Sequence, residues 1–208
     1  ITDGYVGGQA VVEYFRGLLL TLKGTSSEAM SVSVKWDGAP AVVCGTNPDN
    51  GQFFVGTKAV FAKAAKINYT KKDIAKNHGT DELGQKLLKC LVHLKKLNIP
   101  GVVQGDLLFI DDSITRKNID GKPHITFTPN TITYAVPEGG DLSKQIDRAK
   151  LGIIFHTTYT GDSLANMNAQ GGADVSSFAK SNDVFFDNAS YKDVSGSAKF
   201  TADESQQF

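Results

Sequence analysis

The sequence has little of the chemistry that marks metal-binding or disulfide-stabilised proteins. Only two of its 208 residues are cysteines, Cys44 and Cys90, and their spacing matches neither a zinc motif nor a redox motif. Both are predicted to be small apolar residues of the core, which favours a reducing compartment. The four histidines are scattered and form no HxH or HExxH pattern, so no structural metal site is expected.

Long apolar runs are also missing. No run reaches the roughly 20 residues that a membrane span requires, since Lys23 interrupts the leucines that precede it. The first eight residues contain no basic segment followed by an apolar one, so no signal peptide is expected. The chain begins with Ile1 rather than Met, which fits either a processed precursor or a trimmed sequence. We therefore expect no membrane partner.

The chain carries no net charge, because 22 basic and 22 acidic side chains balance. This balance argues against a protein that coats nucleic acid through bulk electrostatics. Residues 1–104 nevertheless hold 13 of the basic and 8 of the acidic side chains. Six lysines in this half lie close together in the sequence: Lys58, Lys63, Lys66, Lys71, Lys72 and Lys76. They form either a local phosphate-facing patch or an ordinary solvated face.

Apolar periodicity predicts an α+β domain built mainly on antiparallel hairpins. Helices are expected over residues 7–23 and from an N-cap at Thr80 toward Pro100. Strands are expected at residues 30–36, 41–44, 53–57, 102–110, 125–127 with 131–136, and 151–158. After Gly161 the pattern weakens, and irregular structure is expected with one or two short elements near residues 175–180. We expect one domain over residues 1–208, with residues 162–208 as an irregular extension.

The stretch Lys-Trp-Asp-Gly-Ala-Pro, from Lys35 to Pro40, lies between two apolar runs. Desolvation and nearby positive charge can lower the pKa of a lysine at a strand end and expose a nucleophilic amine. Such an amine can attack the α-phosphorus of ATP, and Gly38 lets the backbone approach the nucleotide closely. The same letters also fit a surface hairpin in which Asp-Gly only makes the turn.

Three later residues are candidates for the same site. Lys58 follows the apolar strand Phe-Phe-Val-Gly-Thr, Asp106 stands within Val-Val-Gln-Gly-Asp-Leu-Leu, and Tyr134 stands within Thr-Ile-Thr-Tyr-Ala-Val. A buried acid inside an apolar strand needs a partner. Each residue also has a structural interpretation: a solvent-facing strand end for Lys58, a turn cap for Asp106 and core packing for Tyr134. For His156 a position near the site is the alternative, and a hydrogen-bonded strand histidine is expected.

In their order and spacing these segments resemble the covalent lysyl-nucleotidyltransferase superfamily, which contains the DNA ligases, RNA ligases and capping enzymes. The Lys35 stretch is similar to motif I of that superfamily. The resemblance implies a nucleotidyltransferase domain of antiparallel sheets flanked by helices, with ATP and Mg²⁺ as cofactors. It also implies that Lys35 carries the AMP and that Asp37 orients the lysine or a hydrated metal ion.

The same resemblance implies roles for the later segments. Lys58 would contact the ribose or a phosphate, and Asp106, in a segment similar to motif III, would accept hydrogen bonds from the ribose or order a metal-bound water. Tyr134 would stack on adenine, as in motif IIIa. Two departures stand out, because Asp106 is one methylene shorter than the commoner Glu and Val136-Pro137 replaces the usual aromatic-acid pair.

Longer blocks resemble an uncharacterised ligase-like family of large tailed phages. They cover most of residues 30–161 and read KWDGAPA, FFVGTKAVFAKAAK, VVQGDLLF, FTPNTITYAVP and KLGIIFHTTYTG. The resemblance implies a phage protein, present in the cytoplasm of the infected bacterial host or in the virion. Motif IV, Glu-Gly followed by two apolar residues, and motif V, Lys-x-Lys, are not found between Gly161 and Phe208. Either the chain is cut before those strands, or it is a degenerate relative that no longer catalyses.

The sequence thus leaves three hypotheses. The first is an ATP-dependent polynucleotide ligase that joins RNA or DNA ends through a lysyl-AMP. The second is a phage structural or internal virion protein, with other virion proteins as partners, that keeps the fold and has lost the activity. The third is a nucleotide-binding or protein-AMPylating module without a nucleic-acid substrate.

Overall fold

The computed structural model describes residues 4–25, 33–190 and 200–207 and divides the chain into two compact units. The smaller unit contains residues 1–33 and 190–208, and the larger contains residues 34–189. The sequence predicted one domain over residues 1–208. All the candidate site residues lie in the larger unit.

The smaller unit contains helix α1 (Gly4–Leu22) and the short helix α5 (Ala202–Gln207). The helix predicted at residues 7–23 is therefore confirmed. It is followed by Gly24, which adopts a φ of 70° that a glycine reaches at no steric cost. The N–H of Phe200 donates to the carbonyl of Leu22 at 2.9 Å, and Ser33 forms an isolated bridge with Ser190.

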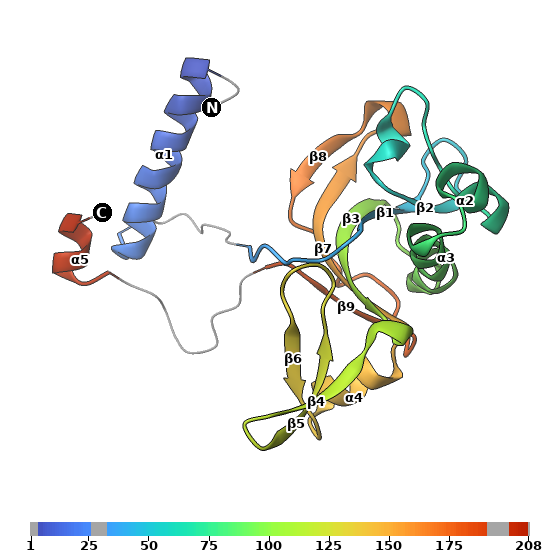
Figure 1. The fold of residues 1–208 in the computed structure, drawn as a ribbon. Coiled ribbons are helices and arrows are strands. Elements are labelled where there is room, and N and C mark those ends of the chain that lie inside the picture. The colour runs from blue at the N-terminus through green and yellow to red at the C-terminus, as the bar shows by residue number, and fades with distance from the viewer. Residues whose placement is uncertain (1–3, 26–32, 191–199, 208) are drawn as a thin grey trace. The chain divides into compact units, whose positions relative to one another are not determined.

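The larger unit is an α+β fold organised by a six-stranded sheet (Figure 1). Its strands are β1 (Ala41–Thr46), β2 (Phe53–Gly56), β3 (Val102–Ile110), β7 (Leu151–Thr160), β8 (Asn168–Gly171) and β9 (Val184–Asn188). The strand order is β2-β1-β3-β7-β8. Strands β8 and β9 share one edge of β7: β9 pairs with the first half of β7, and β8 pairs with the second half. All pairs are antiparallel except β7 with β9, which is parallel.

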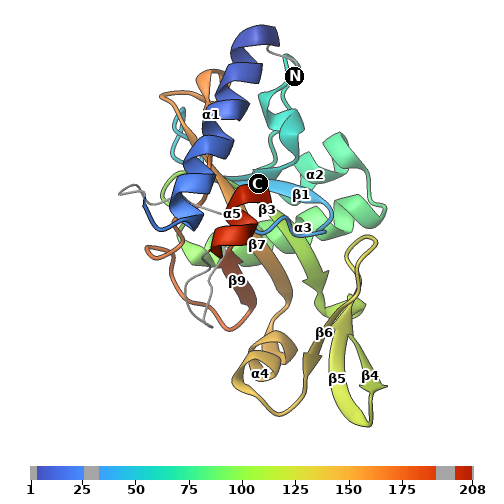
Figure 2. The ribbon, with the colours of Figure 1, turned by 90° about the vertical axis from the view of Figure 1, so that its left-hand side faces the viewer.

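The other helices and strands of this unit fall into two groups (Figure 2). Helices α2 (Lys71–His78) and α3 (Glu82–Leu94) lie beside the large sheet, and the 3-10 turns are Lys58–Phe61, Lys95–Leu97, Asp111–Ser113 and Leu164–Asn166. Strands β4 (Thr115–Ile119), β5 (Lys122–Phe127) and β6 (Tyr134–Pro137) form a second, three-stranded antiparallel sheet next to helix α4 (Asp141–Arg148).

The main core lies between one face of the large sheet and α3. Leu87, Cys90 and Leu94 of α3 pack in one cluster with buried residues of the sheet such as Val103 and Phe155. Both cysteines are buried here, as predicted, and burial raises the pKa of the Cys90 thiol to about 12. We call this side of the sheet the helix-covered face.

The opposite side of the sheet, which we call the second face, carries apolar clusters at its two ends and polar residues between them. Val43 and Val102 belong to one cluster, and Leu108 and Ile154 belong to the other. Residues that pair across neighbouring strands point to the same face, so the pairs Ala41–Asp106 and Asp106–Ile154 place Asp106 on the second face. The candidate site lies in this polar zone.

Several predicted elements need correction. Of the strand predicted at residues 30–36, residues 30–32 lie outside the described residues, Ser33 forms an isolated bridge, and residues 34–36 form no strand. The backbone of this stretch bonds to separate elements, Val34 to Ala189 and Asp37 to Tyr134. The second helix is capped by Asp81 rather than Thr80, since the Asp81 carboxylate accepts the N–H of Gly84. Residues 162–208 are more regular than expected, because they contain β8, β9 and α5, whereas residues 175–180 contain no regular element.

Candidate functional site

The two segments that resemble motifs I and III lie against each other. The N–H of Ala39 donates to the carbonyl of Leu107 at 2.9 Å, and the N–H of Leu107 donates to the carbonyl of Pro40 at 3.1 Å. A Cβ added at Gly38 would lie 2.5 Å from the Cβ of Asp106. Glycine is therefore required at position 38 because the backbone passes directly over Asp106. Residues 68 positions apart in the sequence form one continuous surface here.

Asp37 is held by the turn that joins β5 to β6. Its carboxylate accepts hydrogen bonds from Asn130 Nδ2 at 2.9 Å, from the Thr131 N–H at 2.7 Å and from the Ile132 N–H at 2.8 Å. The bond from the Ile132 amide lowers the pKa of Asp37 most, and the bonds from Asn130 and Thr131 and the positive charge of Lys35 lower it further. The carboxylate predicted to orient the lysine or a metal ion thus fastens the Lys35 segment to the smaller sheet.

Tyr134, the predicted adenine-stacking residue, contacts the same segment. Its hydroxyl oxygen accepts the N–H of Asp37 at 2.9 Å. Its ring stacks with those of Trp36 and Phe127, at centroid distances of 5.3 and 5.5 Å. In the structure these contacts make Tyr134 a positioning residue for the segment that carries Lys35.

The two candidate lysines differ in their surroundings. Lys35 is exposed and lies close enough to Asp37 for its charge to lower the pKa of that carboxyl. Lys58 is also exposed and is the first residue of the 3-10 turn that follows β2. The last residue of β2, Gly56, pairs with Val43 of β1. Among the described residues, Lys58 forms no hydrogen bond or ion pair with another candidate site residue. The structure therefore brings Lys35, Asp37, Gly38, Asp106 and Tyr134 together and leaves Lys58 at the margin.

Asp106 has a partner, His156, for which a position near the site was the less favoured prediction. His156 Nε2 lies 3.4 Å from Asp106 Oδ1, while His156 Nδ1 lies 2.8 Å from the hydroxyl of Thr157. The side chains are 28% and 19% exposed for His156 and Asp106, so both are reachable from solvent. A register shift between β3 and β7 at Gln104 lies opposite His156 and sets this contact. No local sequence signal marks such a shift.

A second carboxylate lies on the same face. Ile154 pairs with Asp106 on one side and with Asp187 of β9 on the other, so both acids point to the second face. Two strand spacings of about 4.8 Å separate their backbones by roughly 10 Å. The prediction missed Asp187, since β9 was expected to be irregular.

The acidic side chains of this surface could hold Mg²⁺ together with a bound nucleotide. Among residues 4–25, 33–190 and 200–207, no group of three or more His, Cys, Asp or Glu side chains could hold a metal ion by itself. Mg²⁺ in nucleotide sites commonly uses one or two carboxylates together with phosphate oxygens and water. Asp106 could supply such a carboxylate, whereas the oxygens of Asp37 already accept three hydrogen bonds.

One of the cavities reaches the Lys35 segment at Ala39. It has a volume of about 230 Å³ and is lined by Ala39, Leu107, Pro129 and charged residues that include Glu82 and Lys86. Lys35 is not among its lining residues. A nucleotide at this site would therefore lie over the surface formed by Gly38 and Asp106 rather than inside this cavity.

Comparison with known proteins identifies a family for the whole chain. A model described as a family of unknown function (DUF6267) matches residues 1–208. Neither a curated protein nor a solved structure matches the chain. Within the described residues, no helix has the length and apolar character needed to cross a membrane.

Proposed function

The chain belongs to the DUF6267 family, and we propose that it is an ATP-dependent nucleotidyltransferase of the RNA- or DNA-ligase type. In the first step the Lys35 amine attacks the α-phosphorus of ATP. A bond forms between Nζ and phosphorus, the bond to pyrophosphate breaks, and the amine gives up a proton to solvent. In the later steps AMP passes to a 5′-phosphate end, and a 3′-hydroxyl then displaces it to join the two ends.

The contact between Gly38 and Asp106 is the observation that supports this proposal. The pairing of β1 with β3 places Ala41 opposite Asp106, so the Lys-x-Asp-Gly segment that precedes Ala41 lies beside the Gly-Asp-Leu segment. Here the two are joined by the Ala39–Leu107 and Leu107–Pro40 hydrogen bonds. The segment that carries Lys35 and the carboxylate of Asp106 therefore lie together, as a lysine nucleophile and an acid that binds the nucleotide would have to.

The contacts also support particular roles. Asp37 and Tyr134 position the backbone of the segment that carries Lys35. Asp106, oriented by His156, accepts hydrogen bonds from the ribose. Lys58 reaches a phosphate only if the nucleotide extends toward the end of β2. Mg²⁺, when bound with ATP, would offset the negative charge of the phosphates.

A second candidate function, from a different class, is a phage structural or internal virion protein that keeps this fold without activity. The observation that favours it is the state of the site itself. The oxygens of Asp37 and the ring of Tyr134 are engaged in structural contacts, and Lys35 is exposed rather than enclosed. In that case the protein is found in the particle rather than free in the host cytoplasm.

Labelling with ATP separates these functions. The full chain is incubated with α-³²P-ATP and Mg²⁺ without nucleic acid, and a protein adduct that is stable in alkali and labile in acid, as a phosphoramidate is, is measured. We expect label that Lys35→Ala abolishes and that Lys63→Ala, a change of another exposed lysine, leaves intact. Absence of label on the unchanged chain contradicts the enzyme, and quantitative recovery of the protein from purified particles then supports the structural role.

Transfer of the label defines the substrate. Incubation of the labelled protein with 5′-phosphorylated RNA or DNA should move the AMP to the nucleic acid if the chain is a ligase. Label that stays on the protein, or that moves only to other proteins, indicates a nucleotide-binding or protein-AMPylating module.

A further inference from the structure

One edge of strand β9 pairs with β7, and among the described residues no strand lies along the other edge at Phe186. Lys150 N–H donates to the carbonyl of Asp183 at 2.7 Å, and Ala189 N–H donates to the carbonyl of Phe155 at 2.8 Å. Residues 183 and 189 therefore turn their backbone groups toward β7, and alternation along the strand turns those of Phe186 outward.

The outward amides on either side of Phe186 are already bonded. Val184 N–H donates to the carbonyl of Ser181 at 3.3 Å, and Asn188 N–H donates to Asp187 Oδ1 at 2.8 Å. No such bond reaches the outward N–H of Phe186 from residues 4–25, 33–190 or 200–207. The outward amides of Val184 and Asn188 are thus hydrogen-bonded. The N–H and C=O of Phe186 lie between them, at the position where a further strand would bond.

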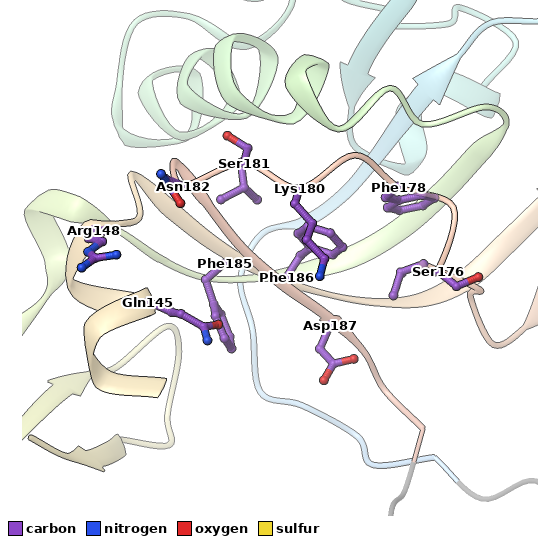
Figure 3. A pocket seen from close by; sticks show the side chains of 12 residues that line it. Gln145, Arg148, Ser176, Phe178, Lys180, Ser181, Asn182, Phe185, Phe186 and Asp187 are labelled. Atoms are coloured by element: carbon purple, nitrogen blue, oxygen red, sulfur yellow. The ribbon is translucent and has the colours of Figure 1, made fainter. Parts of the chain in front are cut away.

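A cavity of about 590 Å³ runs along this edge (Figure 3). Neighbouring residues of a strand point to opposite faces, so Phe185 and Phe186 line the cavity on opposite sides of β9. In Figure 3, Phe185 lies beside Gln145 of α4, and Phe186 lies beside Lys180 of the segment before β9. The cavity is therefore a groove with two walls and a strand edge between them.

Each wall combines an aromatic ring with a cation, and Asp187 also lines the groove, on the face of β9 that carries Phe185. Arg148 lines the wall of Phe185, and Lys180 lines the wall of Phe186. Both cations are exposed, and within the described residues neither forms an ion pair with a carboxylate. Two cations on opposite sides of a strand edge suit a ligand whose acidic groups alternate in direction. An extended peptide has this property, because its successive side chains point to opposite faces.

We infer that the groove along β9 binds an extended acidic peptide segment, which adds a strand to the edge of the large sheet. The backbone of the peptide bonds to the N–H and C=O of Phe186, and its carboxylates pair with Arg148 and Lys180. This binding site lies outside the surface formed by Gly38 and Asp106 and does not depend on nucleotide chemistry.

A phage-displayed library of random heptapeptides, selected on the full chain, tests this inference. Arg148→Glu/Lys180→Glu serves as the counter-selection. We expect enriched peptides to carry Asp or Glu at positions an odd number of residues apart, since such side chains reach both walls. The synthetic peptide should bind at least ten times more weakly to the double variant. Lys144→Glu, which adds the same kind of charge change on α4 outside the groove, should leave the affinity within twofold.

Amide hydrogen exchange provides the second measurement. Bound peptide should slow exchange at Phe186, since that amide becomes hydrogen-bonded. The inference is overturned if no peptide is enriched, if the enriched peptides lack acidic residues or bind the double variant equally well, or if exchange at Phe186 does not change. Light scattering that shows a dimer, with the Phe186 amide protected in the absence of peptide, assigns the groove to a second copy of the chain and also overturns it.

Discussion

Replacing Gly38 by alanine places a methyl group where the structure has no room for one. Its Cβ would lie 2.5 Å from the Cβ of Asp106, 2.9 Å from the carbonyl carbon of Asp106 and 2.9 Å from the carbonyl oxygen of Leu107. Carbon atoms normally approach to about 3.5–4.0 Å. Two of the three atoms belong to the backbone of β3, which is paired on both sides and cannot move aside by a rotamer change.

The cost follows from how the chain can relax. Because β3 is fixed, the segment that carries Gly38 must move away, which strains the Ala39–Leu107 and Leu107–Pro40 hydrogen bonds. Overpacking of this kind costs about 1–3 kcal/mol. For a chain of this size, 1 kcal/mol corresponds to roughly 2–4 °C in Tm. We expect Gly38→Ala to lower Tm by about 2–12 °C.

Urea and thermal unfolding, followed by circular dichroism, measure this loss. Gly101→Ala is the matched control, because a Cβ at Gly101 meets no atom within 4 Å; its free energy of unfolding should change by less than about 0.5 kcal/mol. If both variants unfold like the unchanged chain, the Lys35 segment does not pack on Asp106. In that case the proposed site loses the observation that supports it.

Three further predictions concern the same region and the core. Tyr134→Phe removes the acceptor of the Asp37 N–H and keeps the ring stacking, so it should cost about 1 kcal/mol in urea unfolding; no change would mean that the bond contributes nothing. Because the pKa of Asp37 is lowered in the folded chain, the ionised carboxylate stabilises the fold above about pH 3.9, and this contribution is lost as pH falls through the lowered pKa. Asn130→Ala should raise that pKa in a carboxyl ¹³C NMR titration, and an unshifted titration would contradict the contact. Burial raises the pKa of both the Cys44 and Cys90 thiols, so labelling by a thiol reagent at pH 8 should require unfolding; fast labelling of the native chain would refute the burial of both.

The sequence predicted the parts of the fold in which local pattern and tertiary packing agree. The hairpin of β1 and β2 and the long strands β3 and β7 have continuous apolar runs, and α3 has leucines at helical spacing. Helices α2 and α4 were missed, since each is eight residues long and has few apolar side chains. Strand β9 was missed because its pairing with β7 is parallel and joins segments about 30 residues apart.

For the site, the sequence predicted which residues are candidates but not what they contact. Asp37 and Asp106 were chosen from the order of the segments, and the structure does place those segments together. The partners of Asp37 come from a turn more than 90 residues away, which no pattern around Asp37 indicates. The contact between Asp106 and His156 likewise depends on a register shift between two strands.

The contacts around Lys35 fix its backbone and leave its side chain exposed. On one side, the N–H of Val34 donates to the carbonyl of Ala189 at 2.8 Å; on the other, Asp37 is held by its carboxylate and its amide. Only Lys35 and Trp36 lie between these anchors, and the Trp36 ring is packed on Tyr134. A residue that carries a nucleotidyl group needs such an arrangement, because its backbone must stay in place while its amine moves between ATP and the second substrate. A solvated surface lysine has no need of anchors on both sides. The anchors therefore support the role proposed for Lys35, whereas the exposure of its side chain argues against the desolvated amine that the sequence predicted.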